Sequence, residues 1–219
     1  MSENLYQVTG SVVPDNLIAG VTENLNIKGI TILTGQGALK RGTVLGVITK
    51  ALGEVVADEG NTGNGTITAF ALKAKSKVGN YKLICTAAAE NAGTFNVYDP
   101  EGNRLADATV AVAYANDQIG FTINDGSADF IVGDNFVIPV EEGSKKAKIV
   151  NSANVDGSQV ADCILTDDVD ATSADVNVQA YTTGMFNRQA LVFGGSDTAA
   201  KHEDVLRTKG IILKDNIAN

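Results

Sequence analysis

The sequence has no tryptophan, one histidine, two cysteines and three prolines in 219 residues, and aromatic residues make up only 5%. Two cysteines cannot form a disulfide-rich scaffold. Cys85 and Cys163 each lie among apolar residues, which predicts two buried, reduced thiols. No apolar run approaches the roughly 18 to 20 residues of a membrane-spanning helix, and the first residues lack the basic and apolar regions of a secretory signal. We therefore expect synthesis in the cytoplasm and no membrane partner.

Catalytic motifs are equally scarce. The one histidine, His202, lies beside Glu203 and Asp204, and no serine or cysteine has the sequence context of a hydrolase nucleophile. Gly35-Gln-Gly37 predicts a plain turn, because a dinucleotide-binding loop needs a third glycine and a following helix. We predict that His202 is exposed and inert, that the protein is not an enzyme, and that it binds no cofactor.

One acidic run is a candidate metal site. Asp167, Asp168 and Asp170 are close in sequence, as calcium-binding carboxylates often are. Counted from Asp167, however, Thr172 and Val178 stand where a calcium loop of the EF-hand type needs glycine and glutamate. The run predicts a solvated turn and no metal site, with weak calcium binding left open.

The net charge of −9 is unevenly distributed and argues against a nucleic-acid partner, which needs clustered Lys and Arg. Residues 58–142 carry twelve acidic and five basic side chains, whereas residues 1–57 are balanced and residues 143–219 have a net charge of −2. The central block thus carries most of the negative charge. Such a bias suits a solvent-facing knob, but it is equally compatible with a domain that is simply more soluble.

The abundance of glycine, valine, isoleucine and threonine predicts a β-dominated fold. Residues 1–27 lack a helical period and predict an extended N-terminal arm that could add a strand to a partner's sheet; a frayed terminus is the alternative. A glycine and asparagine cluster at residues 58–65 predicts a flexible boundary. The predicted strands of the central block are Thr66–Leu72, Tyr81–Thr86, Gly93–Tyr98, Ala108–Tyr114, Gln118–Ile123 and Asn135–Val140.

Six short strands in about eighty residues predict a small β-sandwich of the Ig-like kind at residues 58–142. After it, strands are predicted at Val160–Leu165 and Val176–Tyr181. A helix over about Thr198–Thr208, capped by Ser196 or Asp197, ends at Gly210 and leads into a strand at Ile211–Leu213. Its predicted inward face is Ala199, Val205 and Leu206.

Several tracts in a fixed order resemble the head-decoration (capsid cement) proteins of tailed phages, the lambda D type. They are Leu39-Lys-Arg-Gly-Thr-Val-Leu-Gly46, Asp156-Gly-Ser158, Ile164-Leu-Thr-Asp-Asp-Val-Asp-Ala-Thr172, Gly184-Met-Phe-Asn-Arg-Gln-Ala-Leu191 and Leu206-Arg-Thr-Lys-Gly-Ile-Ile212. The resemblance covers roughly the first fifty and last seventy residues. It implies a small β-rich body with one short C-terminal helix, formed by residues 28–57 and 143–219 and interrupted by the inserted block, which the compact family pattern lacks.

The resemblance also implies a function. Proteins of this family bind the outer surface of the expanded head, usually as trimers at three-fold and quasi-three-fold positions, and stabilise it against the pressure of packaged DNA. The expected partners are the major capsid protein and further copies of this chain, and the expected location is the virion. The arm would contact the capsid through Leu5, Tyr6, Val8, Val12 and Val13, and the acidic turn would be structural. A host-surface or carbohydrate-binding adhesion module, using the inserted block, is the alternative.

Overall fold

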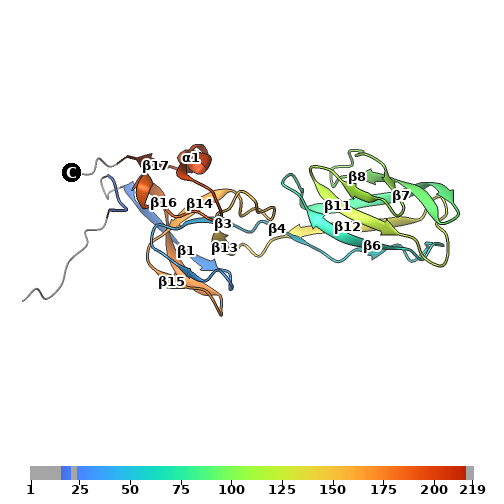
Figure 1. Cartoon of the computed structure of the whole chain (residues 1–219), viewed down its shortest axis with the longest axis horizontal. Helices are drawn as coiled ribbons and strands as arrows, with labels where there is room; N and C mark the ends of the chain where they lie inside the picture. Colours follow the sequence, from blue (N-terminus) through green and yellow to red (C-terminus); the bar gives the residue numbers. More distant parts are fainter. Residues whose placement is uncertain (1–15, 21–23, 216–219) are drawn as a thin grey trace, which may run out of the picture.

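The computed structural model describes residues 16–20 and 24–215, and its two lobes lie end to end along the long axis (Figure 1). We call residues 16–49 with 143–215 the first lobe and residues 50–142 the second lobe. The chain crosses into the second lobe once and returns once, and Lys50 is paired with Glu142 where it does so. The two ends of the block are therefore adjacent, as an insertion requires.

The first lobe is a small barrel. Strands β1 (Asn26–Ile32), β13 (Ala147–Ile149), β3 (Val44–Val47), β14 (Ala161–Leu165) and β16 (Val176–Asn187) follow one another, and β1 also pairs with β16. Strand β17 (Ile211–Lys214) runs parallel to the end of β16, and β2 (Ala38–Leu39) pairs with β15 (Val169–Asp170). The predicted β-dominated fold with one short C-terminal helix is confirmed.

Alternating side chains give this barrel two apolar cores. Val44 and Ile164 belong to the core that includes Leu206 of the helix, whereas Leu45, Cys163 and Leu165 belong to the core with Ile32 and Ala180. Successive residues of a strand point to opposite faces, so β3 and β14 supply both cores at once. Both cysteines are buried and neither forms a disulfide, as predicted.

The helix α1 (Ala199–Thr208) matches the predicted span to within one residue. Its N-cap is Thr198, which makes no side-chain capping hydrogen bond, and Gly210 has a φ of +81° just beyond its end. Leu206 is fully buried as predicted, whereas Ala199 and Val205 are only partly buried. Among the described residues, no helix is long and apolar enough to cross a membrane.

The second lobe consists of two facing sheets. One contains β4 (Lys50–Leu52), β12 (Asn135–Glu142), β7 (Gly79–Ala89), β8 (Ala92–Tyr98) and β9 (Ala108–Thr109), with β5 (Val56–Ala57) also on β12; the other contains β10 (Ala113–Ala115), β11 (Ile119–Asn124) and β6 (Thr66–Leu72). Because β4 and β5 precede residue 58, sheet pairing begins earlier than the boundary that the sequence predicts. The domain limits themselves stay a prediction.

Five of the six predicted strands of the block correspond to single strands, and the sixth is divided. The predicted strand Ala108–Tyr114 is divided into β9 and β10, which lie in different sheets. Ala111, between them, has a φ of +62°, a left-handed conformation that turns the chain at this point. A local backbone turn thus moves the chain from one sheet to the other, and the alternation of apolar residues alone gives no sign of it.

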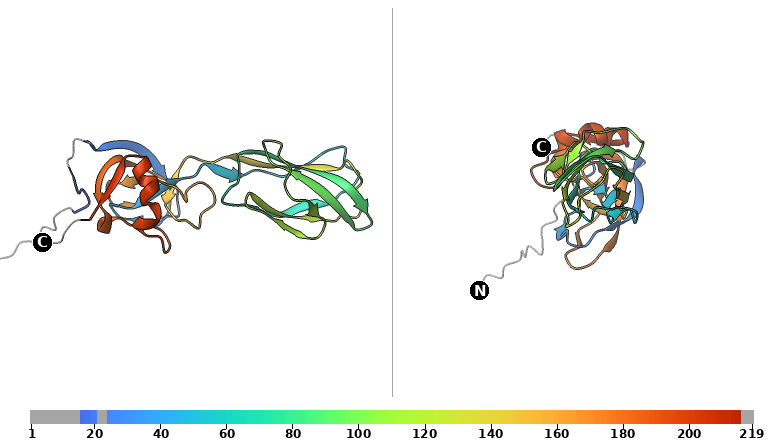
Figure 2. Two further views of the ribbon diagram at one scale, coloured as in Figure 1. Left: turned by 90° about the horizontal axis from the view of Figure 1, so that it is seen from above. Right: turned by 90° about the vertical axis from the view of Figure 1, so that its right-hand side faces the viewer.

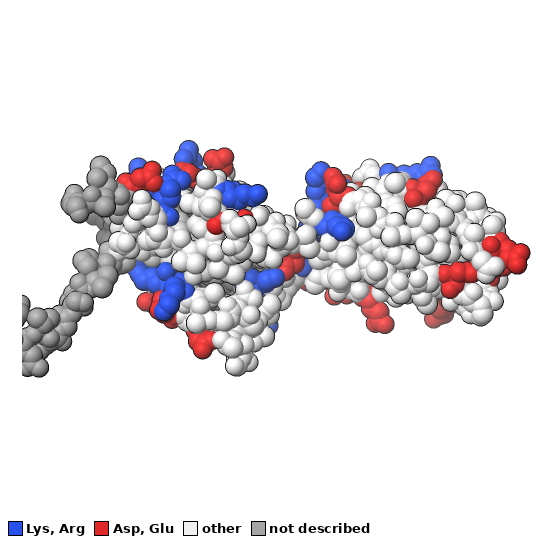
Figure 3. Space-filling view, viewed as in Figure 1, with Lys and Arg blue, Asp and Glu red and all other residues white. Residues whose placement is uncertain are grey.

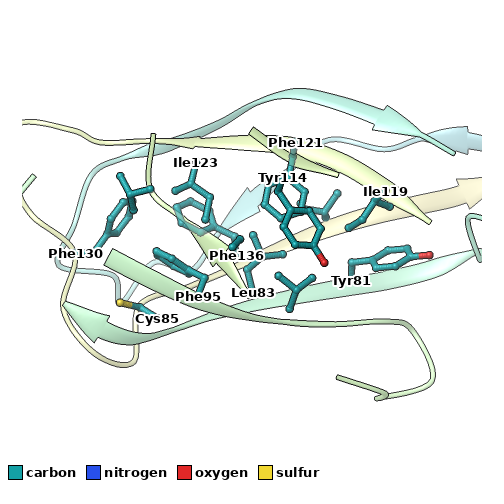
Figure 4. Packing of buried hydrophobic residues seen from close by; sticks show 14 of the residues in the cluster. Tyr81, Leu83, Cys85, Phe95, Tyr114, Ile119, Phe121, Ile123, Phe130 and Phe136 are labelled. Carbon is teal, nitrogen blue, oxygen red and sulfur yellow. The ribbon is translucent and has the colours of Figure 1, made fainter. Parts of the chain in front are cut away.

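Aromatic rings fill the space between these two sheets (Figure 4). The Phe95 and Phe130 rings meet edge to face with centroids 5.1 Å apart, and Tyr114 stacks on Phe121 at 4.6 Å. The buried hydroxyl of Tyr81 donates to Gln118 at 2.8 Å, so its polar end is satisfied. The lobe therefore has its own sandwich-type core; its assignment to the Ig-like class stays a prediction.

We predict that Phe95→Ala destabilises the second lobe by about 3–5 kcal/mol and leaves the first lobe folded, because Phe95 belongs to the core of the second lobe. Hydrogen exchange followed by mass spectrometry would report each lobe separately. The control is Val132→Ala, whose side chain is 63% exposed. Equal loss of protection in both lobes would mean that the chain unfolds as one unit.

Candidate functional site

The first described residues lie against the end of β16, which is the region from which an N-terminal arm would extend. The Asn187 amide donates to the Leu17 carbonyl at 2.8 Å and the Ala19 amide donates to the Met185 carbonyl at 2.9 Å. Ile18 is paired with Phe186 in an antiparallel bridge. Seen from above, the described N-terminal residues and strand β17 lie at one end of the molecule and the second lobe lies at the other (Figure 2).

Close packing holds this segment in place. Leu17 is only 3% exposed and belongs to the same core as Phe186 and Leu206. A Cβ at Gly20 would lie 2.7 Å from the Met185 side chain, and one at Gly42 would lie 2.6 Å from the Ala190 carbonyl oxygen. Both approaches require glycine. The predicted arm, residues 1–27, therefore includes residues that form part of the first lobe, since β1 also begins at Asn26.

Ion pairs surround the adjoining helix. The Arg188 guanidinium makes two hydrogen bonds to Glu203, at 2.6 and 2.9 Å, and one to Asp215 at 2.8 Å. Asp162 on β14 accepts from Lys28 of β1 and from Lys209, which follows the helix. Burial alone would raise the pKa of Asp162, but the two hydrogen bonds and the charges of the two lysines together outweigh it, and its pKa lies below the ordinary value. The charged groups thus connect three elements of the lobe.

The prediction that His202 is an exposed helix residue is wrong. The residue is 4% exposed, its Nε2 lies 2.8 Å from Asp197 Oδ2, and its ring stacks on Phe193 with centroids 5.4 Å apart. Asp197 also accepts from the backbone amide and the hydroxyl of Ser152. Asp197 fixes the loop at Ser152 to the start of the helix, and its hydrogen bonds explain why it does not cap that helix.

The acidic turn makes contacts within the protein. Asp168 accepts from the Lys40 ammonium at 2.7 Å and from the Arg41 amide at 2.8 Å, and the Asp170 carboxylate accepts from the Thr172 amide at 3.0 Å. Asp167 is exposed on the same turn. Within residues 16–20 and 24–215, no three His, Cys, Asp or Glu side chains are placed to hold a metal ion.

The far end of the second lobe is acidic. Three hydrogen-bonded loops, residues 58–65, 89–92 and 125–134, contain six carboxylates and no Lys or Arg. The face drawn in Figure 3 shows acidic side chains and no basic ones at this end, whereas basic side chains lie on the first lobe and nearer the junction. The phenylalanines of this lobe are buried or partly buried, and so are Tyr98 and Tyr114. The described residues therefore offer no cluster of exposed aromatics for stacking on a sugar.

The predicted capsid-contact residues, namely Leu5, Tyr6, Val8, Val12 and Val13, all lie outside the described residues. Their role stays a prediction.

The comparison with protein families decides the assignment. The model of the bacteriophage lambda head decoration protein D family matches residues 6–211, which is nearly the whole chain. The chain belongs to this family. The resemblance inferred from the short tracts is thereby confirmed, and a member of this family is a structural protein of the phage capsid.

Other comparisons add little to the lambda D family assignment. No curated protein matches the chain. Two crystal structures of FlgL from Xanthomonas campestris match with 22% and 21% identity, each with a TM-score of 0.32. They cover 52% and 50% of this chain, which spans about a third of the length of either FlgL chain. Matches at this level carry no structural or functional argument.

Several residues that shape this end of the decoration protein escaped the sequence analysis. The predicted arm includes Leu17, and the sequence gives no sign of the partners of Arg188 and Asp197. Arg188 and Glu203 are fifteen residues apart, and Ser152 and Asp197 are forty-five apart. Spacings of this size have no local periodicity, so only the tertiary fold reveals these contacts.

We predict that Leu17→Ala lowers the free energy of unfolding of the first lobe by about 2–5 kcal/mol, because it removes a buried side chain. Amide exchange at Ala19 and Asn187 should accelerate, since both amides are bonded across this contact. Ile27→Ala is the control, because that side chain is 54% exposed. Unchanged exchange at both amides would contradict the anchoring role of Leu17.

A pH dependence follows from Asp197. The hydrogen bond from Ser152, aided by His202 and opposed by burial, lowers its pKa from 3.8 to about 2. The unfolded state therefore binds a proton more readily, and this contribution to stability, fully present above about pH 4, is lost as the pH falls towards 2.

We predict that the thermal stabilities of the native protein and of Asp197→Asn differ most above pH 4 and converge towards pH 2. Unfolding temperatures measured from pH 2 to pH 6 would test this. Asp204→Asn, at an exposed position on the same helix, should follow the native protein throughout. A difference that stays constant with pH would contradict the assigned role of Asp197.

Proposed function

We propose that this protein is a cement protein of the phage head, which binds the outer surface of the expanded capsid as a homotrimer at three-fold and quasi-three-fold positions. Its partner there is the major capsid protein, and its N-terminal arm makes the principal contact. The role is structural rather than catalytic. The single observation that carries the proposal is the family match over residues 6–211.

The arrangement of the chain supports an orientation in which the first lobe faces the capsid. The described N-terminal residues and β17 lie at one end of the first lobe, and the second lobe extends from the opposite end (Figure 2). An arm that starts beside β16 can reach a surface beneath the first lobe without passing the second lobe. The second lobe would then project away from the capsid.

The distribution of charge is consistent with the same orientation. The second lobe holds most of the net negative charge, and its far loops contain only acidic charged groups. Like-charged lobes on neighbouring trimers would repel one another and remain solvated. The first lobe, with nearly balanced charge, can be buried against a protein partner at a smaller electrostatic cost.

Stabilisation follows from selective binding. A protein that binds the expanded lattice and not the unexpanded one lowers the free energy of the expanded state at every occupied site. Many such sites on one shell add up, so a modest affinity per site resists a large internal pressure. Binding of host-surface glycans by the second lobe is a weaker proposal, because no described side-chain cluster supports it.

Co-sedimentation with expanded, undecorated heads of the same phage tests the proposal. We predict saturable binding by the full chain and at least tenfold weaker binding after deletion of residues 2–13. The deletion must end before Asn16, because Leu17 belongs to the core and its loss would also unfold the first lobe.

Two point variants serve as a matched pair within the arm. Val8→Asp places a charge on a predicted contact residue and should weaken binding, whereas Ser11→Ala should bind as the native protein does. Failure of the intact, folded protein to bind expanded heads would refute the proposed function. Binding that survives the deletion would keep the capsid as partner and remove the arm as its anchor.

A further inference from the structure

Strand β1 is paired along its whole length on one side only. All seven of its residues pair with β16, whereas its other edge pairs with β13 at a single position, Ile32 with Ala147. The two parallel strands diverge before that point. The barrel is therefore open on this side, between β1 and residues 144–146.

The backbone of Gly29 faces this open edge. The Leu33 amide donates to the Ala147 carbonyl at 2.9 Å, and alternate residues of a strand direct their amide and carbonyl groups to the same side, which places Thr31 and Gly29 on the side of β13. Gln179, the residue of β16 paired with Gly29, independently indicates that the backbone groups of Gly29 point away from β16. Its carbonyl accepts from Thr166, on the edge of β16 away from β1.

A groove runs along this edge. It has a volume of about 690 Å³ and is lined by β1, Val47, Val178 and the Ser144–Lys146 segment. Three lysines border it, and each is already paired: Lys28 with Asp162, Lys145 with Glu142, and Lys146 with Asp175. The groove thus combines free backbone groups and apolar side chains with charges that need no further partner.

Residues 4–14 of this chain have the matching chemistry. Asn-Leu-Tyr-Gln-Val-Thr-Gly-Ser-Val-Val-Pro is an uncharged run of eleven residues with several good strand formers. An uncharged segment leaves the three ion pairs of the groove undisturbed, and its backbone can bond to the groups of Gly29. Addition of an extended segment to an exposed sheet edge is an established mode of recognition.

We propose that the open edge of β1 binds the N-terminal segment of a neighbouring copy, as an added strand that joins the copies of the trimer. The direction of the described chain favours a neighbour. Leu17 to Ala19 run antiparallel to β16. Towards the N-terminus the chain therefore passes Asn187 and moves away from the other end of β16, where Asn177 and Val178 line the groove. The twelve Cα-to-Cα steps from Asn4 to Asn16 can span up to about 40 Å.

This inference rests on the proposed trimer and gives it a physical contact. Every second side chain of an added strand points away from the groove, so a strand in this position can still present one face to the capsid. The same segment would then join neighbouring copies and the capsid surface. That arrangement spreads load from one subunit to the next.

Cross-linking on decorated heads tests the inference. Gln7→Cys and Ile27→Cys are combined in one chain and treated with a short bismaleimide; the native Cys85 and Cys163 are buried and should not react. We expect covalent species of two and three copies on denaturing gels. Each single-cysteine variant should give at least tenfold less of these species, because one of the two positions that the reagent joins is then missing.

Gly29 supplies a matched pair of variants. Gly29→Pro removes the amide that the added strand would use and should reduce the cross-linked species at least tenfold. Gly29→Ala keeps the amide, and its Cβ has nothing within 4 Å, so it should cross-link as the parent does. Thermal unfolding of both variants shows whether the barrel is intact. If Gly29→Pro unfolds, the second test deletes residues 2–6 from the chain that carries Gln7→Cys and Ile27→Cys. This deletion should also reduce cross-linking.

The outcomes separate this inference from the proposed function. Heads that are fully decorated but give no species larger than one chain would overturn the inference and leave the cement role intact. A cross-link within single chains would likewise overturn it, because the segment would then occupy its own groove. Absence of decoration would refute the proposed function itself.

Discussion

The pairing of β1 with β16 is the interaction on which the first lobe depends. Strand β16 is twelve residues long and contacts β1, β14, β17 and the Leu17–Ala19 segment. It joins β1 to β14 within the barrel, supports the strand that follows the helix, and fixes the point at which the N-terminal chain enters. Residues far apart in sequence are thus placed at one end of the molecule by a single strand.

The second lobe depends on tight backbone contacts where the chain leaves and re-enters the barrel. A Cβ on Gly143 would lie 2.5 Å from the Lys50 amide nitrogen, and one on Gly157 would lie 2.0 Å from the Thr49 hydroxyl. The Lys50 ammonium donates to the carbonyls of Ala74 and Ser76 within the second lobe. The close approach of these segments lets a large block be inserted between β3 and β13 without opening the barrel core.

Charge is used differently in the two lobes. In the first lobe, pairs such as Arg188 with Glu203 join elements distant in sequence and restrain the helix against β16. In the second lobe, Asp134 accepts amides of Thr62, Gly63 and Ile131 and so orders the glycine-rich loops at the far end. Part of the negative charge there serves loop structure, and the exposed remainder is available to keep the lobe solvated.

The sequence by itself determined the β-dominated fold, the family and the two buried thiols, because these follow from composition, from alternation and from short tracts in a fixed order. It also placed the helix and most strands, whose signals are local. Only the tertiary structure decided that His202 is buried, that Leu17 belongs to the core, that Ala111 carries the chain between sheets, and that one edge of β1 is open. Each of these depends on side-chain packing, on strand pairing or on a backbone angle, and none of these leaves a periodic trace in the chain.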